Sequence, residues 1–575
     1  MKKFLKLTAI IIAAILTVSL VACDAAPDGM EGGWGDILDN PSGGIMQDQN
    51  NSSIADGDDA VSPEAGNPDE NIPDWEEVMT GVEFEEGEVE GGTMAEAPDA
   101  GEPEGTDPDG AEQDTETVFP DDPIDHLPSP SLITTPFINA EEIRFSTFSA
   151  DVDTASYTYF RKLAGYGYSL NELRNSGSNF RIEEFINYFR YDAKQPGEDE
   201  LFGVTATIVP CPWNEGTLLL RATLQAENPK NEAPNNLVFL IDVSGSMSSS
   251  DKLPLLKKAF SYLVNNLKPS DTISIVTYSG QEAVVLDGCK GSNPDAIMKA
   301  INSLGASGST NGEAGLTMAY KIAEKHMKEG SNNRIIMATD GDLNVGISSA
   351  DELTKYIEQK RDQGVYLSIL GFGTGNYRDD RMEALADNGN GVYYYIDGES
   401  EAEKVFGTDL LGTLYTVAND VKLQIEFDPQ YVESYRLIGY DNRVLDKEDF
   451  ENDAKDAGEV GAGHQVTVCY EIKIKSDPTE NGSGKYMTLR VRYKNPGEPV
   501  SRLNEYEIGT QNLTAQADTD TRFITSVIEL ASLLRNPDYS GDITVQSVLA
   551  ELNGLNLTDS YKVEFREIVK ALAAK

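Results

Sequence analysis

Cysteine and histidine are scarce in this sequence, with four cysteines and three histidines among 575 residues. No C-x-x-C pair occurs, and the histidines are scattered along the chain: His126, His326 and His464. A zinc site of sulfur and imidazole ligands is therefore not expected. Apart from Cys23, the cysteines are Cys211, Cys289 and Cys469. Three thiols can form one disulfide at most, and the sequence does not decide whether they form it.

Positive charge is absent from a long segment near the start. Between Asp24 and Pro130 there are 32 Asp and Glu residues and no Lys or Arg, and the formal net charge of the chain is −51. This balance argues against a nucleic-acid partner, because phosphate binding needs Lys and Arg on one face. Residues 23–136 are also rich in Gly, Pro and Ser, so we expect a long disordered acidic tether. Its carboxylates are candidate ligands for cations, for a basic partner or for a metal site elsewhere in the chain.

Only one apolar run is long enough to concern a membrane. It lies in the opening stretch MKKFLKLTAIIIAAILTVSLVAC, which begins with a basic segment. This order is typical of a secretory signal peptide, which we expect over residues 1–22. A transmembrane helix is the alternative, but LVAC at Leu20 to Cys23 resembles the bacterial lipobox. That resemblance implies a lipidated Cys23 with palmitate-like acyl chains. It places the protein on the extracytoplasmic face of the cell membrane, with an outer membrane as the alternative.

The common signatures of catalysis are also missing. H-E-x-x-H, G-x-S-x-G and a phosphate loop ending in Lys do not occur. Ser249 and Lys252 form an S-x-x-K pair, but the S-D-N and K-T-G elements of penicillin-interactive hydrolases are absent. The stretch from Asp340 begins like a calcium loop, yet its glycine, Gly346, is one place late and Asp351 stands where Glu is needed. We therefore do not expect an enzyme.

What the sequence does contain is an alternation of apolar runs with helical segments over about residues 234–415. The runs LVFLI, TISIV, RIIMA and VYLSILGF are apolar on both sides of the predicted strands. This pattern predicts a parallel sheet with helices on both faces. The segment from Leu253 to Leu267 has apolar residues at helical spacing and is one of the predicted helices.

Strict alternation of apolar and polar residues occurs on both sides of this region. LLLRATLQA comes before it, and QVTVCYEIKIK and YMTLRVRYK follow it. Period two is typical of half-buried antiparallel strands. Neither side alone has enough strands for a sandwich. We therefore expect one β-sandwich-like domain made from residues 200–232 and 418–510, with the α/β domain inserted into it.

Helices are expected at both ends of the foldable part. Residues 137–199 are predicted to be a helical segment that opens with a short strand from Arg144 and continues in a helix beginning near Asp153. Asp151 and Asp153 are expected to act as helix caps, with cation binding as the alternative. Residues 515–575 are predicted to be a small helical C-terminal domain with one apolar stripe. The predicted fold class is thus multidomain α/β plus β: a doubly wound parallel sheet inserted in a β-sandwich-like domain, a small C-terminal helical domain and a long disordered N-terminal tether.

Hard oxygen ligands gather in three loops of the α/β region. Asp242, Ser244 and Ser246 follow its first strand, Thr310 comes just before a helix, and Asp340 ends another strand. In open parallel sheets ligands bind at the carboxyl ends of the strands, where these loops meet. Two carboxylates and three hydroxyls without sulfur or imidazole suit a small hard cation. We expect Mg²⁺, with Mn²⁺ or Ca²⁺ as alternatives.

These motifs carry a family resemblance. DVSGSM, the Gly-Ser-Thr loop and TDGD resemble the metal-ion-dependent adhesion site (MIDAS) of von Willebrand factor type A (VWA) domains. STFSADVDTASY, FRIEEFINYF, PCPWN, YRLIGYDNR and DAGEVGAGH resemble segments of bacterial lipoproteins of the YfbK type. The resemblance implies that the first Asp, both Ser and the Thr surround Mg²⁺ together with waters, that the second Asp acts through water, and that a partner carboxylate completes the shell. Those roles fall on Asp242, Ser244, Ser246, Thr310 and Asp340.

The expected function is therefore that of a surface-tethered binding protein, anchored in the membrane by its N-terminal lipid. It would recognise a protein or cell-envelope ligand through a carboxylate bound to Mg²⁺. The alternative is an envelope scaffold or assembly factor in which the metal is only structural. A hydrolase is a distant third reading. The sequence does not name the ligand, the envelope type or the oligomeric state.

Overall fold

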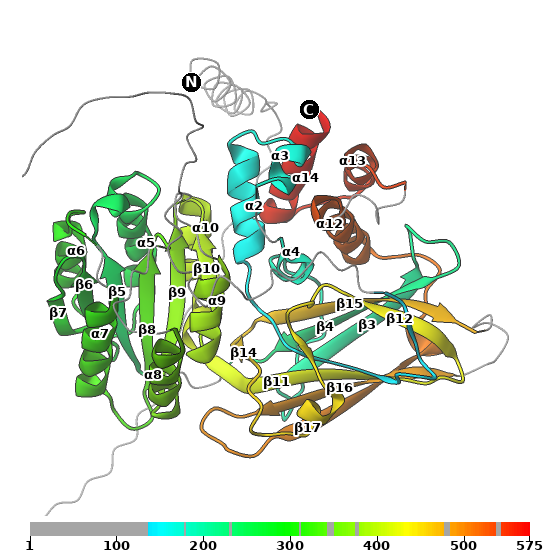
Figure 1. Cartoon of the computed structure of the whole chain (residues 1–575), viewed down its shortest axis with the longest axis horizontal. Helices are drawn as coiled ribbons and strands as arrows, with labels where there is room; N and C mark the ends of the chain where they lie inside the picture. Colours follow the sequence, from blue (N-terminus) through cyan, green and yellow to red (C-terminus); the bar gives the residue numbers. More distant parts are fainter. Residues whose placement is uncertain are drawn as a thin grey trace, which may run out of the picture. The chain divides into compact units, whose positions relative to one another are not determined.

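The computed structural model describes residues 136–176, 180–228, 233–309, 312–341, 350–373, 379–475, 484–535 and 542–575. The expected signal peptide, Cys23, the acidic tether and Thr310 lie outside these residues. The described part contains an α/β region, two further β-sheets and a layer of helices (Figure 1). The fold class expected from the sequence is confirmed for this part of the chain.

The α/β region is built on a six-stranded sheet with the order β10-β9-β8-β5-β6-β7. All neighbours are parallel except β7, which runs antiparallel to β6 at one edge. The strands are β5 (Asn235–Asp242), β6 (Thr272–Tyr278), β7 (Ala283–Lys290), β8 (Asn332–Thr339), β9 (Val365–Phe372) and β10 (Tyr393–Ile396). The helices are α5 (Leu253–Asn266), α6 (Pro294–Ser303), α7 (Gly312–His326), α8 (Ala350–Asp362), α9 (Asp379–Asn388), α10 (Glu399–Glu403) and α11 (Leu410–Leu414).

Strand β5 is apolar on both sides because helices cover both faces of the sheet (Figure 1). Phe239 packs against Phe260 of α5, with ring centroids 4.5 Å apart. Val238 and Leu240 belong to a separate core with residues of α7 and α8. Successive side chains of a strand point to opposite faces, so an unbroken apolar run is what a doubly covered strand requires.

Two further sheets make a β-sandwich. One has the order β1-β12-β15-β4-β3, and the other has the order β13-β2-β11-β16-β17 with β14 paired to β11. Their strands are β1 (Ile138–Asn139), β2 (Phe145–Ser149), β3 (Phe202–Pro210), β4 (Leu218–Ala226), β11 (Thr416–Phe427), β12 (Val432–Ile438), β13 (Val444–Leu445), β14 (Gly458–Gly461), β15 (Gln465–Ile474), β16 (Lys485–Lys494) and β17 (Arg502–Gly509). Phe427 of one sheet stacks on Tyr435 of the other, with centroids 3.9 Å apart.

Strand pairing joins the segments on either side of the α/β region. β4 precedes that region and β15 follows it, and Leu220 lies opposite Tyr470 in their antiparallel ladder. The short strand expected from Arg144 corresponds to β2, but neither β1 nor the membership of these two strands in the sandwich was predicted. β1 pairs with β12 in one sheet, and β2 pairs with β11 in the other. Their pairing partners are almost 300 residues away, so no local pattern indicated where either strand pairs.

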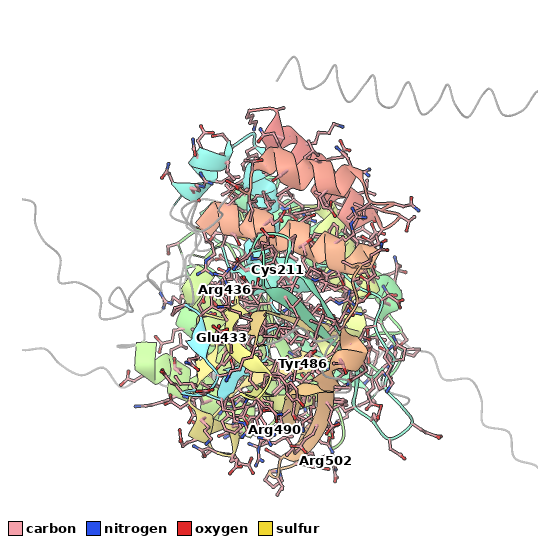
Figure 2. All side chains as sticks on the ribbon, turned by 90° about the vertical axis from the view of Figure 1, so that its right-hand side faces the viewer. Cys211, Glu433, Arg436, Tyr486, Arg490 and Arg502 are labelled. Atoms are coloured by element: carbon pink, nitrogen blue, oxygen red, sulfur yellow. The ribbon has the colours of Figure 1, made fainter. Side chains whose placement is uncertain are left out.

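The remaining helices share a second core. They are α2 (Ala155–Gly165), α3 (Leu170–Arg174), α4 (Ile182–Asn187), α12 (Thr519–Arg535), α13 (Val545–Asn553) and α14 (Ser560–Ala573). Phe189, just after α4, contacts Phe523 and Phe565 of the C-terminal helices at 4.8 and 5.5 Å between centroids. Cys211, labelled beneath the helices in Figure 2, also belongs to this core. Cys211, Cys289 and Cys469 are all free thiols.

None of the helices in the described ranges combines the length and apolarity that a bilayer crossing needs.

The interpretation of Asp151 and Asp153 as helix caps is wrong. Thr154 occupies the cap position of α2, and no side chain caps the helix there. Asp151 and Asp153 are buried and contact Arg443 at 3.3 and 3.4 Å, and Asp153 also accepts a hydrogen bond from the Tyr393 amide. Because Arg443 lies about 290 positions away in the chain, a local pattern could only favour the commoner capping role.

Candidate metal centre

The central strands bring two carboxylates to the same edge of the α/β sheet. β5 ends at Asp242, and Asp340 directly follows the end of β8, its parallel neighbour. Ile241 lies opposite Ala338 in that ladder, so both aspartates leave the sheet at nearly the same level. Both are almost completely buried. The parallel register, which the apolar runs predicted, is therefore what places the two carboxylates close to each other.

The loop after β5 folds back over its own aspartate. The Ser244 amide donates to Oδ1 of Asp242 at 2.8 Å, and the hydroxyls of Ser244 and Ser246 lie 3.0 Å apart. A short 3-10 turn, η2 (Gly245–Ser248), follows, with the buried Met247 fixing it to the core. The carboxylate and both hydroxyls are thus brought together as the sequence predicts.

The residues just before Thr310 are hydrogen-bonded to the loop that follows β5. The Gly245 amide donates to the Gly308 carbonyl at 3.0 Å, and the Ser307 amide donates to the Val243 carbonyl at 2.7 Å. Thr310 itself lies outside the described residues, as do Asp342, Asn344 and Gly346 of the calcium-loop alternative. Four of the five predicted ligands, Asp242, Ser244, Ser246 and Asp340, are therefore in the described part, at one end of the sheet.

Lys252 also belongs to this site, although no sequence motif placed it there. Its ammonium donates to Oδ2 of Asp340 at 2.8 Å and to the Ser246 carbonyl at 3.0 Å. In the sequence, Lys252 stood out only as part of the S-x-x-K pair. Its position just before α5, six residues after Ser246, was the signal that could have placed it beside the site.

The electrostatics of Asp242 favour a cation. Burial raises the pKa of Asp242 to about 6, opposed by hydrogen bonds from Ser244 and reinforced by the nearby charge of Asp340. Its Oδ2 is buried without a well-formed hydrogen bond, although the Tyr278 hydroxyl interacts with this carboxylate. Buried polar atoms are nearly always satisfied by a partner, so an oxygen in this state is a ready ligand for a cation.

The donor set decides which cation fits. No cluster of three or more His, Cys, Asp or Glu side chains able to hold a metal occurs among the described residues. The site offers two carboxylates and serine hydroxyls instead, which are hard ligands that suit Mg²⁺ with part of its water shell retained. The residues present therefore fit the predicted Mg²⁺ and do not fit a soft metal.

The other motifs of the sequence meet away from this site. A buried ion cluster joins α9 of the α/β region to three other segments of the chain. Those segments contribute Asp151 and Asp153, Arg181 and Glu184 from FRIEEFINYF, and Arg443 from YRLIGYDNR. Arg181 contacts Glu184 at 2.7 Å and Glu383 at 2.5 Å, and Arg443 contacts Glu383 at 2.8 Å and Asp387 at 2.6 Å. These motifs therefore hold the α/β region to the sandwich and to the helices.

The parallel sheet with its antiparallel edge strand, and the Asp and Ser side chains at the ends of β5 and β8, are typical of a VWA domain. The family model of the von Willebrand factor type A domain matches residues 236–408. A model described as von Willebrand factor matches residues 130–221, and one described as "Uncharacterized protein YfbK, C-terminal" matches residues 412–574. The chain belongs to the YfbK family of bacterial VWA-domain proteins. It is 37% identical to "Uncharacterized protein YfbK" of Escherichia coli (strain K12) over 451 residues, which cover 74% of this chain and 77% of that protein.

More distant similarity extends to other VWA proteins. Inter-alpha-trypsin inhibitor heavy chain H3 of Homo sapiens is 28% identical over 204 residues, covering 34% of this chain and 22% of that protein. A solved structure, von Willebrand factor type A from Catenulispora acidiphila, is 17% identical and covers 60% of this chain and 80% of that chain. Its TM-score is 0.36, and it adds nothing to the family assignment. A VWA domain indicates a protein-interaction or adhesion role, and the names of these relatives denote no reaction.

Proposed function

We propose that this protein is a surface-tethered receptor that binds a carboxylate of a protein or cell-envelope ligand through Mg²⁺. The observation that supports it most is the meeting of Asp242, Ser244, Ser246 and Asp340 at the carboxyl edge of the sheet. The metal, when bound, supplies an electrophilic position for a carboxylate oxygen. Thr310 is proposed as a further ligand because the residues before it are hydrogen-bonded to the loop after β5.

The residues of the chain have separate tasks in this proposal. Asp242 is fixed by the Ser244 amide and keeps one buried oxygen for the cation or its waters. Ser244 and Ser246 present neutral hydroxyls, so they hold the cation without cancelling its charge. Tyr278 and the apolar end of β5 surround Asp242 and exclude bulk water, which strengthens the attraction between cation and carboxylate.

The anchor is part of the same proposal. Lipidation of Cys23 would hold the protein at the extracytoplasmic face of the cell membrane, and residues 24–136 would separate the binding site from the bilayer. A receptor for an envelope ligand needs both the anchor and the reach. The support comes from the lipobox-like LVAC and from the acidic composition of the segment that follows it.

The alternative, an envelope scaffold in which the metal is structural, is favoured by one observation. Arg161 of α2 pairs with Asp397 at 2.6 Å and Glu401 at 2.8 Å in the VWA domain, and with Glu564 of α14 at 3.2 Å. This contact holds three parts of the molecule in one arrangement, as a scaffold requires. In that case partner binding would not depend on the exposed coordination position of the metal.

A crosslinking pull-down from envelope fractions separates the two functions. The full chain and its Asp242→Ala variant serve as bait, each with Mg²⁺ and with a chelator. A receptor captures its partner only as wild type in Mg²⁺, whereas a scaffold captures it in all four samples provided that the variant is folded. Capture that ignores both the chelator and the substitution contradicts the proposed function.

A further inference from the structure

Lys252 is a cation built into the candidate metal centre. Its ammonium is bonded to one of the predicted ligands, Asp340, and to the carbonyl of another, Ser246. Only 12% of the Lys252 side chain is exposed, and 1% of the Asp340 side chain. An ion pair so little exposed is screened weakly by solvent, so its charge acts on anything bound beside Asp340.

The Lys252 side chain packs against the backbone of Gly373, which follows β9. A Cβ atom at Gly373 would lie 2.2 Å from Cε of Lys252, and the φ of this residue is +75°, which favours glycine. The bare backbone of Gly373 thus leaves room for the aliphatic part of the lysine. Such a fit between a distant glycine and one side chain indicates a built position.

The turn before Lys252 is fixed from outside the VWA domain. Asp251 accepts a hydrogen bond from the Ser249 hydroxyl at 2.6 Å and pairs with Lys162 of α2 at 2.8 Å. Lys252 then occupies the cap position of α5. This is an unfavourable place for a cation, because the N-terminus of a helix attracts anions. Its ion pair with Asp340 is the compensating contact.

The net charge of Asp242, Asp340 and Lys252 affects which ions and ligand groups the site binds. Asp242 and Asp340 carry two negative charges, and Lys252 reduces the net charge of the empty site to minus one. A divalent cation then gives a net charge of plus one, whereas without Lys252 the loaded site would be neutral. We propose that Lys252 determines the specificity of this site: it lowers affinity for the bare cation and makes the loaded site favour an anionic ligand group. This inference rests on the proposed function.

The test uses the full chain with Mn²⁺, which can be followed directly by its electron paramagnetic resonance signal, and with acetate as the anionic probe. Lys252→Met removes the charge and keeps an unbranched apolar chain against Gly373. It should bind Mn²⁺ about tenfold more tightly than wild type, and acetate should tighten Mn²⁺ binding less than it does in wild type. Lys252→Gln should behave in the same way, which guards against a folding defect peculiar to one variant.

The matched control is Lys258→Met, on the same helix. Lys258 is 62% exposed and pairs with Glu399 at 3.0 Å, away from the centre. It should bind Mn²⁺ and respond to acetate as wild type does. If Lys252 had only a structural role, replacing it would not change how much acetate tightens Mn²⁺ binding.

The failures can be told apart. Mn²⁺ bound equally by wild type and by Asp242→Ala overturns the proposed function and this inference with it, because the ion is then held elsewhere. If Asp242→Ala loses the ion but both Lys252 variants bind Mn²⁺ no more tightly than Lys258→Met, only the role of Lys252 is overturned. If the Lys252 variants bind Mn²⁺ more tightly but acetate tightens Mn²⁺ binding as much as it does in wild type, Lys252 does not make the loaded site favour an anionic ligand group. That result overturns this part of the inference.

Discussion

The Tyr415 hydroxyl donates a hydrogen bond to the Ala233 carbonyl over 2.7 Å. The chain enters the VWA domain at one of these residues and leaves it at the other, so the two crossings lie side by side. Asn235 strengthens the junction by donating to the same hydroxyl at 2.9 Å.

This junction predicts that the VWA domain folds by itself. Residues 234–415 expressed alone should be soluble and melt cooperatively, since ends that meet do not strain an isolated domain. The remainder, closed by a short Gly-Ser bridge, should also fold, although with lower stability because Arg161 loses Asp397 and Glu401. Circular dichroism melts of both pieces check this. A folded insert with an unstructured remainder contradicts the inserted-domain arrangement.

The ion cluster around Arg443 predicts a large mutational effect. Arg443→Met leaves four carboxylates, those of Asp151, Asp153, Glu383 and Asp387, without their shared cation. Removing one partner of a buried ion pair costs about 3–5 kcal/mol, which urea unfolding of both proteins measures. The matched control is Arg502→Met. Arg502, labelled in Figure 2, forms an exposed pair with Glu498, so its replacement should leave the free energy of unfolding unchanged within error.

Acid should partly rescue Arg443→Met. Burial, more than neighbouring charge, holds the pKa values of Asp153 and Glu383 well above those of free carboxyls. A carboxyl with a raised folded-state pKa favours folding more as pH falls, because the folded state then binds the extra proton. The stability gap between variant and wild type should therefore narrow as pH is lowered from neutral. If the difference in stability between wild type and Arg443→Met stays constant with pH, Arg443 does not stabilise the protein through this cluster.

The burial of His464 predicts that the stability of the wild-type protein falls as the pH is lowered, which is opposite to the effect of the buried carboxyls. Burial, helped by the charge of Arg190, lowers the pKa of His464 to about 3. The unfolded chain binds a proton near pH 6.5 and the folded chain does not, so this residue lowers stability by about 1.4 kcal/mol per pH unit below that point. His464→Gln should remove this slope. Parallel stability–pH curves for variant and wild type between pH 6.5 and 4 contradict the burial of a neutral imidazole.

The resemblance of LVAC to a lipobox predicts how Cys23 is processed. Cys23→Ser should remove acyl labelling and leave the protein unprocessed or released from the membrane, because the thiol is the only attachment point that LVAC provides. Radiolabelled palmitate in growing cells, followed by fractionation, makes the comparison. Labelling of the variant equal to that of wild type contradicts the lipid anchor.

Periodicity predicted the architecture because its signals are local. The apolar runs of β5 and β8 and the alternation in β4 and β15 each lie within one strand. The same runs indicated that Asp242 and Asp340 share a sheet edge, since the carboxyl ends of parallel strands coincide. Nothing local could show that Lys252 reaches Asp340 across 88 positions, or that Asp153 meets Arg443. Those contacts depend on how the layers pack, and the commoner local roles of such residues were the reasonable prediction.

The most direct test of the central claim is the melting temperature of the full chain with and without Mg²⁺, for wild type and for Asp242→Ala. Asp362→Ala, which removes an exposed carboxylate from the same domain, is the control. A ligand that binds only the folded state must raise the melting temperature. Mg²⁺ should therefore stabilise wild type and the control but not Asp242→Ala, which stays folded because the apolar residues of β5 remain. If Mg²⁺ raises all three melting temperatures equally, the cation binds elsewhere and the metal centre at Asp242 is contradicted.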